Sequence, residues 1–351
     1  MDRYADQLAA SLEAAVQVNY RVSEYRPALG GVSRKLPHLA NLQMRYARYV
    51  DYPGQARKLN ADIFHILDHG YAHLLKVLDP QRTVVTAHDM IPLLAGRGLI
   101  PGVTLRRNWL AEYSSSFLRR ARKVIADSES TKRDIVRYCG CEPARVAVVH
   151  PGLGSEFRCL DEPADELRRR LGVPGSELRL VLITGGQFYK NHAASLEVMR
   201  ILRQKHGDSI VLVRLGPADA QWRQSLEKSA YRGRVIEFSK LGAEQLAALY
   251  NAVDCLLFPS WYEGFGWPPL EAMACGTPAV TSNRASLPEV MGQVGPTFDA
   301  DDVEAMAAAV ETMLFDREQA AAQIERGLRH AAGFQWRETA TRVQAIYEAV
   351  V

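Results

Sequence analysis

The amino-acid sequence predicts an α/β protein made of two domains, each built on a parallel sheet, with a cleft between them. The chain has 351 residues, about twice the size of an ordinary domain. Short β-branched runs alternate with helical stretches in both halves, as in parallel sheets with right-handed crossovers. The composition is that of a globular protein, with 47% hydrophobic and 24% charged residues. No apolar run approaches the roughly 20 residues that a membrane-spanning helix needs.

The expected elements follow in order along the chain. An amphipathic helix at about residues 3–14 comes first. Five strands are then expected in the front half, at residues 16–22, 62–67, 83–86, 124–126 and 146–149. Five more are expected at residues 180–184, 210–214, 235–238, 255–258 and 279–281. A stretch rich in proline, glycine and acidic residues after Gly152 marks the boundary, so we expect domains at 1–155 and 156–334, with a last helix at about 335–351 belonging to the first.

The front half of the chain is basic. Residues 1–150 hold 22 Lys and Arg against 14 Asp and Glu, a balance of +8, whereas the rest holds 21 against 26. Leu105, Trp109, Tyr113 and Phe117 recur every four residues within a cluster of basic side chains: Arg106, Arg107, Arg119, Arg120, Arg122 and Lys123. Such a stretch either lies on an anionic membrane surface or packs on the domain core with a solvated basic flank.

Cysteine usage and the N-terminal sequence indicate a compartment. The five cysteines are scattered at positions 139, 141, 159, 255 and 275, an odd number without paired zinc spacing. The first residues lack the basic-then-apolar pattern of a secretory signal. We expect a reducing cytoplasm, with association at the inner face of the cell membrane as the alternative suggested by the basic half. No nucleic-acid partner is expected.

Residues 258–276 form the segment with the clearest chemistry. After the strand at 255–258, a loop leads into a helix that Pro268 and Pro269 open and Gly276 closes, as short helices require. Backbone N–H groups at a helix start suit a phosphate. Glu263 and Glu271 then suit neutral hydroxyls, those of a sugar and of a ribose. The alternative is a solvated Glu263 and a Glu271 that only complements the helix dipole.

The whole block 263–290 resembles the donor-binding region of the retaining group 1 glycosyltransferases (family 4 type), which include bacterial mannosyl- and glucosyltransferases. That family carries two glutamates with seven residues between them, as at Glu263 and Glu271. The resemblance implies the GT-B fold, in which two Rossmann-like domains face each other across a cleft. It places a donor-sugar contact at Glu263 and a ribose contact at Glu271. It also implies that the backbone of Gly264, Phe265 and Gly266 meets the sugar and the β-phosphate.

The loop 184–191 resembles the basic phosphate loop of the same family. The resemblance places donor contacts at Gly186, Gln187 and Lys190, and Lys190 would stabilise the leaving diphosphate as its charge develops. The family usually has an arginine near Gln187, which is absent here, and we name Arg214 as its substitute. A plain surface lysine is the alternative for Lys190.

In the front half, His88 directly follows a strand, where the family places an active-site histidine near the donor sugar; a structural histidine is the alternative. Ser128 lies in a similar family loop near the cleft, and His69 follows the strand at 62–67. We expect both on the acceptor side, with packing alone as the alternative for His69. Family members also begin with a strand and a glycine pair that this chain lacks, so we expect Met1 to be an internal start and the shortened chain to be less stable or less active.

Two motifs resemble metal sites and are interpreted otherwise. Asp299 and Asp301 mimic the Asp-x-Asp of metal-dependent transferases, but they stand just before a helical stretch and are assigned to helix capping. Cys139 and Cys141 lack metal-ligand spacing. No metal site is expected.

The predicted function is retaining, metal-independent hexosyl transfer without a cofactor. The donor is a nucleotide diphosphate sugar, with GDP-mannose favoured and a UDP-sugar as the alternative, and the acceptor is a saccharide or a lipid-linked hydroxyl. Two other functions stay open: a nucleotide-sugar epimerase, and an inactive homologue that binds donor without turnover. A dinucleotide-dependent oxidoreductase is disfavoured because no Gly-x-Gly-x-x-Gly loop opens the first βα unit.

Overall fold

The computed structural model describes residues 2–14, 21–26, 37–101, 107–229, 231 and 233–351. The chain divides into two compact units. The first comprises Met1–Arg97, Arg106–Gly152 and Trp336–Val351, and the second comprises Gly98–Leu105 and Leu153–Gln335. The two-unit α/β architecture is the predicted fold class.

The first unit holds a parallel four-stranded sheet of order β1-β2-β3-β4. Its strands are β1 (Phe64–Ile66), β2 (Thr83–Ala87), β3 (Lys123–Ala126) and β4 (Val146–Val148). Its helices are α1 (Asp2–Ala14), α2 (Pro37–Tyr46), α3 (Tyr52–Ala56), α4 (Ile91–Gly96), α5 (Trp109–Ser115), α6 (Glu129–Cys139) and α15 (Trp336–Glu348). The predicted first helix and these four strands are confirmed. The strand expected at 16–22 lies outside the described residues, except for Arg21 and Val22, which are irregular.

The second unit holds a parallel six-stranded sheet of order β10-β9-β8-β5-β6-β7. The strands are β5 (Arg179–Thr184), β6 (Ile210–Leu215), β7 (Val235–Phe238), β8 (Cys255–Phe258), β9 (Ala279–Ser282) and β10 (Thr297–Phe298). The helices are α7 (Ala164–Leu171), α8 (His192–His206), α9 (Ala220–Glu227), α10 (Ala243–Ala252), α11 (Trp267–Ala274), α12 (Leu287–Met291), α13 (Val303–Phe315) and α14 (Arg317–Ala331). The five predicted strands are confirmed, and β10 was not predicted because two residues carry no periodicity.

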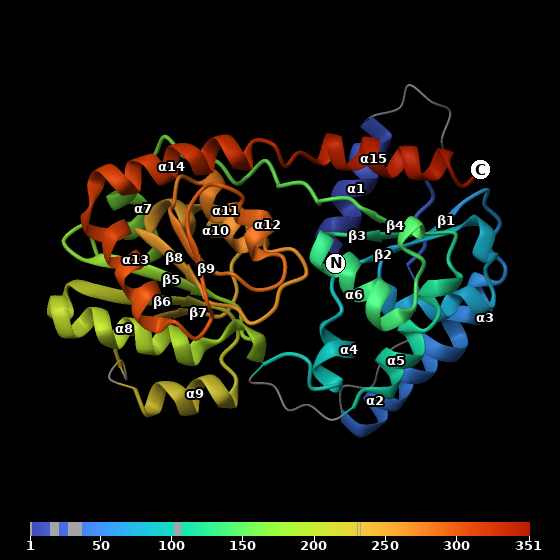
Figure 1. The fold of residues 1–351 in the computed structure, drawn as a ribbon, viewed down its shortest axis with the longest axis horizontal. Helices are drawn as coiled ribbons and strands as arrows, with labels where there is room; N and C mark the ends of the chain where they lie inside the picture. The colour runs from blue at the N-terminus through green and yellow to red at the C-terminus, as the bar shows by residue number, and fades with distance from the viewer. Residues whose placement is uncertain (1, 15–20, 27–36, 102–106, 230, 232) are drawn as a thin grey trace. The chain divides into compact units, whose positions relative to one another are not determined.

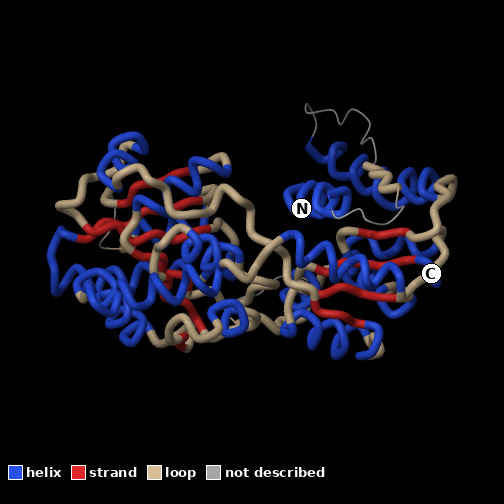
Figure 2. The backbone as a smooth tube through the Cα atoms, turned by 90° about the horizontal axis from the view of Figure 1, so that it is seen from above, coloured by secondary structure: helices blue, strands red, loops and turns tan. Residues whose placement is uncertain are grey.

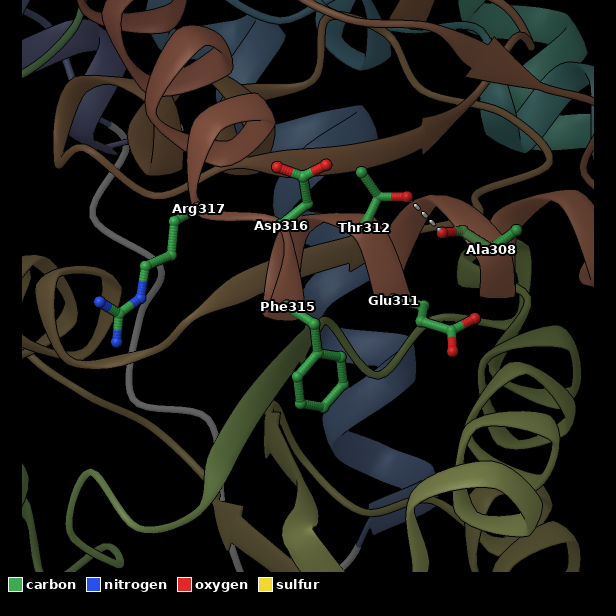
Figure 3. Close-up of a pocket in the computed structure, with 6 residues that line it drawn as sticks. All are labelled: Ala308, Glu311, Thr312, Phe315, Asp316 and Arg317. Atoms are coloured by element: carbon green, nitrogen blue, oxygen red, sulfur yellow. Dashed lines mark hydrogen bonds between the residues drawn. The ribbon is translucent and has the colours of Figure 1, made fainter.

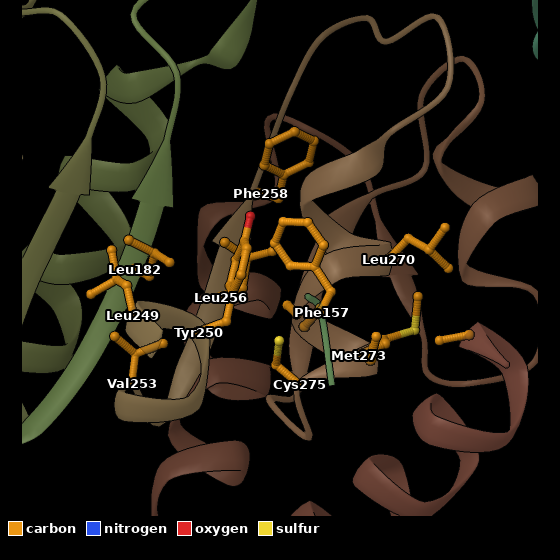
Figure 4. Packing of buried hydrophobic residues seen from close by; sticks show 14 of the residues in the cluster. Phe157, Leu182, Leu249, Tyr250, Val253, Leu256, Phe258, Leu270, Met273 and Cys275 are labelled. Carbon is orange, nitrogen blue, oxygen red and sulfur yellow. The ribbon is translucent and has the colours of Figure 1, made fainter. Parts of the chain in front are cut away.

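Helices cover both faces of the six-stranded sheet, and the alternation along β5 shows why. Leu180 and Leu182 point to a core shared with α10, α11 and α12, which includes Phe258, whereas Val181 and Ile183 point to a core shared with α8 and α13. Because a strand exposes successive side chains to opposite faces, an uninterrupted apolar run must be covered twice. Figure 4 shows the packing of the first core, and Figures 1 and 2 show the helices around the strands.

The C-terminal helix α15 belongs to the first unit, where it packs on α1. The rings of Tyr4 and Trp336 meet edge to face with centroids 5.3 Å apart. A Cβ atom at Gly152 would lie 2.3 Å from the backbone nitrogen of Trp336, so only glycine admits this approach.

The aromatic stripe of the front half is divided between core and surface. Phe117 is buried, Tyr113 is half-buried and Trp109 keeps 66% of its surface exposed. Leu105 and Arg106 lie outside the described residues. Packing on the core therefore accounts for the Phe117 end of the stripe and not for the Trp109 end. None of the described helices is long and apolar enough to cross a bilayer.

Candidate donor site

The strand order of the second unit reverses direction between β5 and β8. These two strands are hydrogen-bonded neighbours, with Val181 opposite Cys255, and the chain continues outward from β5 to β6 and β7 and from β8 to β9 and β10. In open α/β sheets, ligands bind beyond the carboxyl ends of the strands at such a switch point. The loops that follow β5 and β8 carry Lys190 and Glu263.

The structure brings Lys190 and Glu263 into direct contact. The Nζ atom of Lys190 lies 2.8 Å from the Oε1 atom of Glu263, and both side chains are only 9% exposed. The ammonium also lies over the ring of Phe258, 4.5 Å from its centroid. The backbone joins the same loops, because the N–H of Trp261 donates to the carbonyl oxygen of Tyr189 at 2.8 Å. Lys190 is therefore a buried, ion-paired lysine and not a surface residue.

Tight backbone packing shapes the loop that precedes Lys190. Gly185 has a φ of +93°, and a Cβ atom there would lie 2.7 Å from the Cε atom of Lys190. A Cβ atom at Gly186 would lie 2.6 Å from the carbonyl oxygen of Pro217. Gln187 is exposed, and its side chain accepts from the N–H of Gly186 at 3.2 Å. The first glycine thus makes room for the lysine stem, and the second packs on the next loop.

Asn191 then turns the chain into helix α8. Its φ of +53° is left-handed, a conformation that asparagine tolerates. Its side-chain amide donates to the carbonyl oxygen of Ala300 at 2.9 Å, and its side-chain oxygen accepts from the N–H of Ala194 at the helix start. These contacts fix the position from which Lys190 reaches Glu263.

The loop that carries Glu263 is held from behind by Ser286. The Oγ atom of this buried serine lies 3.0 Å from the carbonyl oxygen of Glu263 and 2.5 Å from that of Phe265, and its one proton serves either. Gly266 ends the loop with a φ of +113°, and a Cβ atom there would lie 3.0 Å from Leu287. The loop conformation therefore requires a glycine and a hydroxyl at these two positions.

Helix α11 begins directly after Gly266 and has fewer backbone N–H groups in its first turn than an ordinary helix. Pro268 and Pro269 occupy its first turn and have no N–H. These two positions therefore cannot donate to a phosphate, and the expected contact with the backbone of Gly264, Phe265 and Gly266 stays a prediction.

Glu271 lies in α11, buried at 4% exposure. Its Oε2 atom accepts from the hydroxyl of Tyr250 at 3.0 Å. Tyr250 is itself buried, and its carbonyl oxygen accepts from the Thr277 hydroxyl. Tyr250 thus fixes the orientation of the carboxylate, and we did not anticipate this role because nothing in the sequence pairs the two positions.

Arg214 does not offer a free cation in this structure. Its side chain is fully buried, and its guanidinium donates to the carbonyl oxygens of Gly216 and Pro217 at 2.9 and 2.8 Å. It also lies 3.3 Å from a Glu237 carboxylate oxygen. The geometry makes Arg214 a brace for the loop that packs on Gly185 and Gly186, and direct contact with a donor has no support here.

The other candidate residues lie in the first unit, at the carboxyl ends of β1, β2 and β3. His88 pairs with Asp127, with 2.8 Å between Nδ1 and Oδ2, and its Nε2 atom lies 2.9 Å from the carbonyl oxygen of Leu67. His69 is buried, and its Nδ1 atom lies 3.5 Å from the Oδ1 atom of Asp68. Ser128 is fully buried and caps helix α6, accepting from the N–H of Thr131 at 3.1 Å, so its hydroxyl is committed to a structural contact.

Two polar residues of the first unit escaped prediction. Asp127 directly follows β3 as His88 follows β2, and the residues before them, Ala87 and Ala126, are register partners. The matching positions of the two residues after neighbouring strands could have indicated this pair. His65 lies in β1 with its ring nitrogens 2.5 Å from the hydroxyl of Tyr347 and 2.7 Å from that of Thr86. Burial, with a smaller effect from His88, lowers the pKa of His65 to about 3, so the ring is neutral.

The acidic motif before α13 caps its helix with a different residue from those expected. Asp302, not Asp299 or Asp301, accepts from the N–H of Ala305 at 3.0 Å. Asp299 accepts from the N–H of Asp301 and pairs with Arg284 at 2.8 Å. The helix begins at Val303, as expected, so its N-cap is the residue just before it, and capping by Asp299 or Asp301 was wrong by one to three residues.

A hollow formed by α13 and α14 is unrelated to this site. Figure 3 shows its lining, with Phe315 and Glu311 among the labelled residues. Glu311 pairs with Lys205 and His206 at the end of α8, just before β6 starts at Ile210. The hollow therefore lies at the amino edge of the sheet, whereas Lys190 and Glu263 follow the carboxyl ends of their strands.

Comparison with known proteins identifies the family. Residues 163–330 match the model of "Glycosyl transferases group 1", and residues 1–157 match that of "Glycosyltransferase Family 4". The chain belongs to the glycosyltransferases, with the group 1 model matching its second half. This family member is 30% identical over 273 residues to the serotype-specific mannosyltransferase WbdA of Escherichia coli, a match that covers 74% of this chain and 32% of WbdA. The chain thus spans about a third of that relative's length.

Solved structures of the GT-B type carry the same fold as this family member. Sucrose-phosphate synthase from Thermosynechococcus elongatus superposes with a TM-score of 0.76 at 20% identity, covering 99% of this chain and 92% of that one. HepE from Anabaena, solved in complex with UDP-glucose, superposes with a TM-score of 0.71 at 15% identity, covering 86% and 82%.

Proposed function

We propose that this chain transfers a hexose from a nucleotide diphosphate sugar to a hydroxyl acceptor with retention at the anomeric carbon and without a metal or cofactor. The observation that carries the proposal is the buried Lys190–Glu263 contact at the switch point of the second unit. A cation at that place suits the leaving diphosphate, and a carboxylate beside it suits the hydroxyls of the donor sugar.

In the proposed reaction, the bond between the anomeric carbon and the β-phosphate oxygen breaks while the acceptor oxygen attacks from the same face. The acceptor proton passes to the departing phosphate oxygen. Lys190 stabilises the negative charge that develops on the diphosphate, Glu263 holds sugar hydroxyls, and Glu271 accepts from the ribose. The loop backbone at Gly264, Phe265 and Gly266, together with Gly186 and Gln187, completes the donor contacts.

We favour mannose and a GDP-linked donor because the relative WbdA is a mannosyltransferase. The UDP-glucose complex of HepE supports a UDP-sugar as the alternative. Saccharide or lipid-linked hydroxyls are the proposed acceptors, with His88 and His69 assigned to catalysis and to the acceptor side. The proposed location is the cytoplasm, at the inner membrane face.

Contact with an anionic membrane is proposed from one surface of the first unit. Leu42 and Tyr46 of α2 and Trp109 of α5 are 65%, 58% and 66% exposed, and they line one hollow with Arg45. Exposed aromatic and aliphatic side chains beside an arginine suit a lipid interface with anionic headgroups. Cosedimentation with anionic but not neutral vesicles, lost in Trp109→Ser, tests this contact.

A donor screen tests the reaction itself. Thermal shift against GDP-, UDP- and dTDP-sugars identifies the bound donor, and NMR of the sugar product reports its anomeric configuration. Donor hydrolysis or transfer should be lost in Lys190→Ala and Glu263→Ala and kept in Lys205→Ala, an exposed lysine of α8. Binding without turnover in wild type would instead favour an inactive homologue, and a free epimerised sugar nucleotide would favour an epimerase.

A further inference from the structure

In this structure, the ammonium of Lys190 and the carboxylate of Glu263 are each other's charge partner. One ammonium and one carboxylate meet at 2.8 Å in a place where each side chain is 9% exposed. The ammonium also lies over the rings of Phe258 and Tyr189, 4.5 and 5.4 Å from their centroids. Charges that are removed from water must keep a partner, because an unpaired buried charge is strongly unfavourable. A ligand that pairs with one of these two side chains must therefore offer a hydrogen-bonding or charged partner to the other as well.

A bare nucleoside diphosphate can provide for only one member. Its phosphate oxygens can replace Glu263 as the partner of Lys190. The carboxylate of Glu263 is then left buried, without its cation and close to a second anion, and like charges at short distance repel. A diphosphate offers no hydrogen-bond donor to compensate for this loss.

A nucleotide sugar can provide for both members. Its diphosphate pairs with Lys190, and the hydroxyl groups of its sugar donate to Glu263. The carboxylate then exchanges a salt bridge for hydrogen bonds to a charged acceptor, which are among the stronger ones in proteins. After transfer the sugar has gone, and the pair can form again as the diphosphate leaves.

We infer that the Lys190–Glu263 ion pair makes the site discriminate against the bare nucleoside diphosphate, which favours the intact donor and promotes release of the product. This inference rests on the proposed function, because it takes the ligand to be a nucleotide diphosphate sugar. It adds a role for Glu263 that the sugar contact alone does not require.

The experiment compares wild type with Glu263→Gln. For each protein, calorimetry measures the Kd of the nucleoside diphosphate and the Kd of the nucleotide sugar. The glutamine keeps the size and hydrogen-bonding capacity of the side chain and removes its charge. GDP and UDP are titrated alone, as are GDP-mannose and UDP-glucose. We expect the Kd of the bound nucleoside diphosphate to fall about tenfold in Glu263→Gln, a change of about 1.4 kcal/mol, while the Kd of the nucleotide sugar stays the same or rises.

Two control variants make the result specific. Glu311→Gln removes a carboxylate that also lies 2.8 Å from a lysine, Lys205, but in an exposed pair on the opposite edge of the sheet, and it should leave every Kd unchanged. Glu263→Asp keeps the charge and should not tighten diphosphate binding. Thermal melts of each variant verify that it is folded.

The outcomes separate the inference from the proposed function. Wild type that binds neither nucleoside diphosphate nor nucleotide sugar overturns the proposed function. Wild type that binds both, with a Glu263→Gln variant that holds the diphosphate no more tightly, overturns the inference alone. A tightening that Glu263→Asp reproduces also overturns it, since the charge would then not be the cause.

Discussion

The Nδ1 atom of His88 lies 2.8 Å from Oδ2 of Asp127 while its Nε2 atom lies 2.9 Å from the carbonyl oxygen of Leu67. A carbonyl oxygen only accepts, so Nε2 must carry a proton, and a second proton on Nδ1 suits an ionised Asp127. Burial alone lowers the pKa of His88, but the charge and hydrogen bond of Asp127, with help from Asp68, raise it above its usual value. Both ring nitrogens of His88 are therefore engaged by protein groups in this structure.

We therefore predict that stability depends on pH through His88. A folded-state pKa above the unfolded value of about 6.5 means that the contribution is complete below about pH 6.5 and is lost as the pH rises through the folded pKa. Asp127→Asn should abolish this decline and lower the pKa of His88. Urea unfolding at several pH values and NMR titration of the ring measure both effects. An unchanged His88 titration in Asp127→Asn would contradict the assignment.

Ser286→Ala should impair donor use without unfolding the protein. The substitution leaves the buried carbonyl oxygens of Glu263 and Phe265 without their hydroxyl donor, a loss of about 1–2 kcal/mol, which corresponds to about a tenfold drop in kcat/KM if the loop shifts. Ser229→Ala removes a comparable hydroxyl bonded to the Leu226 carbonyl in α9 and should leave kinetics unchanged. Equal kinetic effects from both variants would refute a special role for Ser286.

Gly266→Ala should destabilise the second unit more than Gly172→Ala does. Both glycines have positive φ, +113° and +69°, but a Cβ atom at Gly172 meets open space whereas one at Gly266 meets Leu287 at 3.0 Å. The control, Gly172→Ala, should lower the free energy of unfolding by about 1–2 kcal/mol, the cost of an alanine in a left-handed conformation. Gly266→Ala should lower it by about 1 kcal/mol more because Leu287 must also shift. Guanidinium unfolding of the two variants compares them directly, and similar midpoints would count against this account of the loop.

Arg214→Lys should destabilise the protein although it preserves the charge. A lysine cannot bridge the carbonyl oxygens of Gly216 and Pro217 in the way that the guanidinium fork does, and the expected loss is about 2–4 kcal/mol because buried acceptors lose their donors. Arg200→Lys, in an exposed pair with Glu197, should be neutral. If Arg214→Lys kept its stability and lost only donor affinity, direct contact between Arg214 and the donor would be supported instead.

Local pattern was enough to predict most of the framework. Uninterrupted apolar runs such as 180–184 and 255–258 are buried on both faces of a parallel sheet, and such burial leaves its mark in composition. The loops that carry Lys190 and Glu263 could also be predicted to lie at the same edge of the sheet. Both loops follow strands of one parallel sheet, and parallel strands all end at one edge. The two-residue strand β10 could not, since its pairing with β9 depends on neighbours that are not adjacent in sequence.

The sequence by itself determined the fold class, the approximate places of nine of the ten strands found in the described residues, and the residue types at the donor site. Only the tertiary structure decided which charges meet: Lys190 with Glu263, His88 with Asp127, and Arg214 with backbone carbonyls. The physical reason is that a side chain's identity sets what it can bond to, whereas its partner depends on which loops the sheet order brings together and on how much water remains between them.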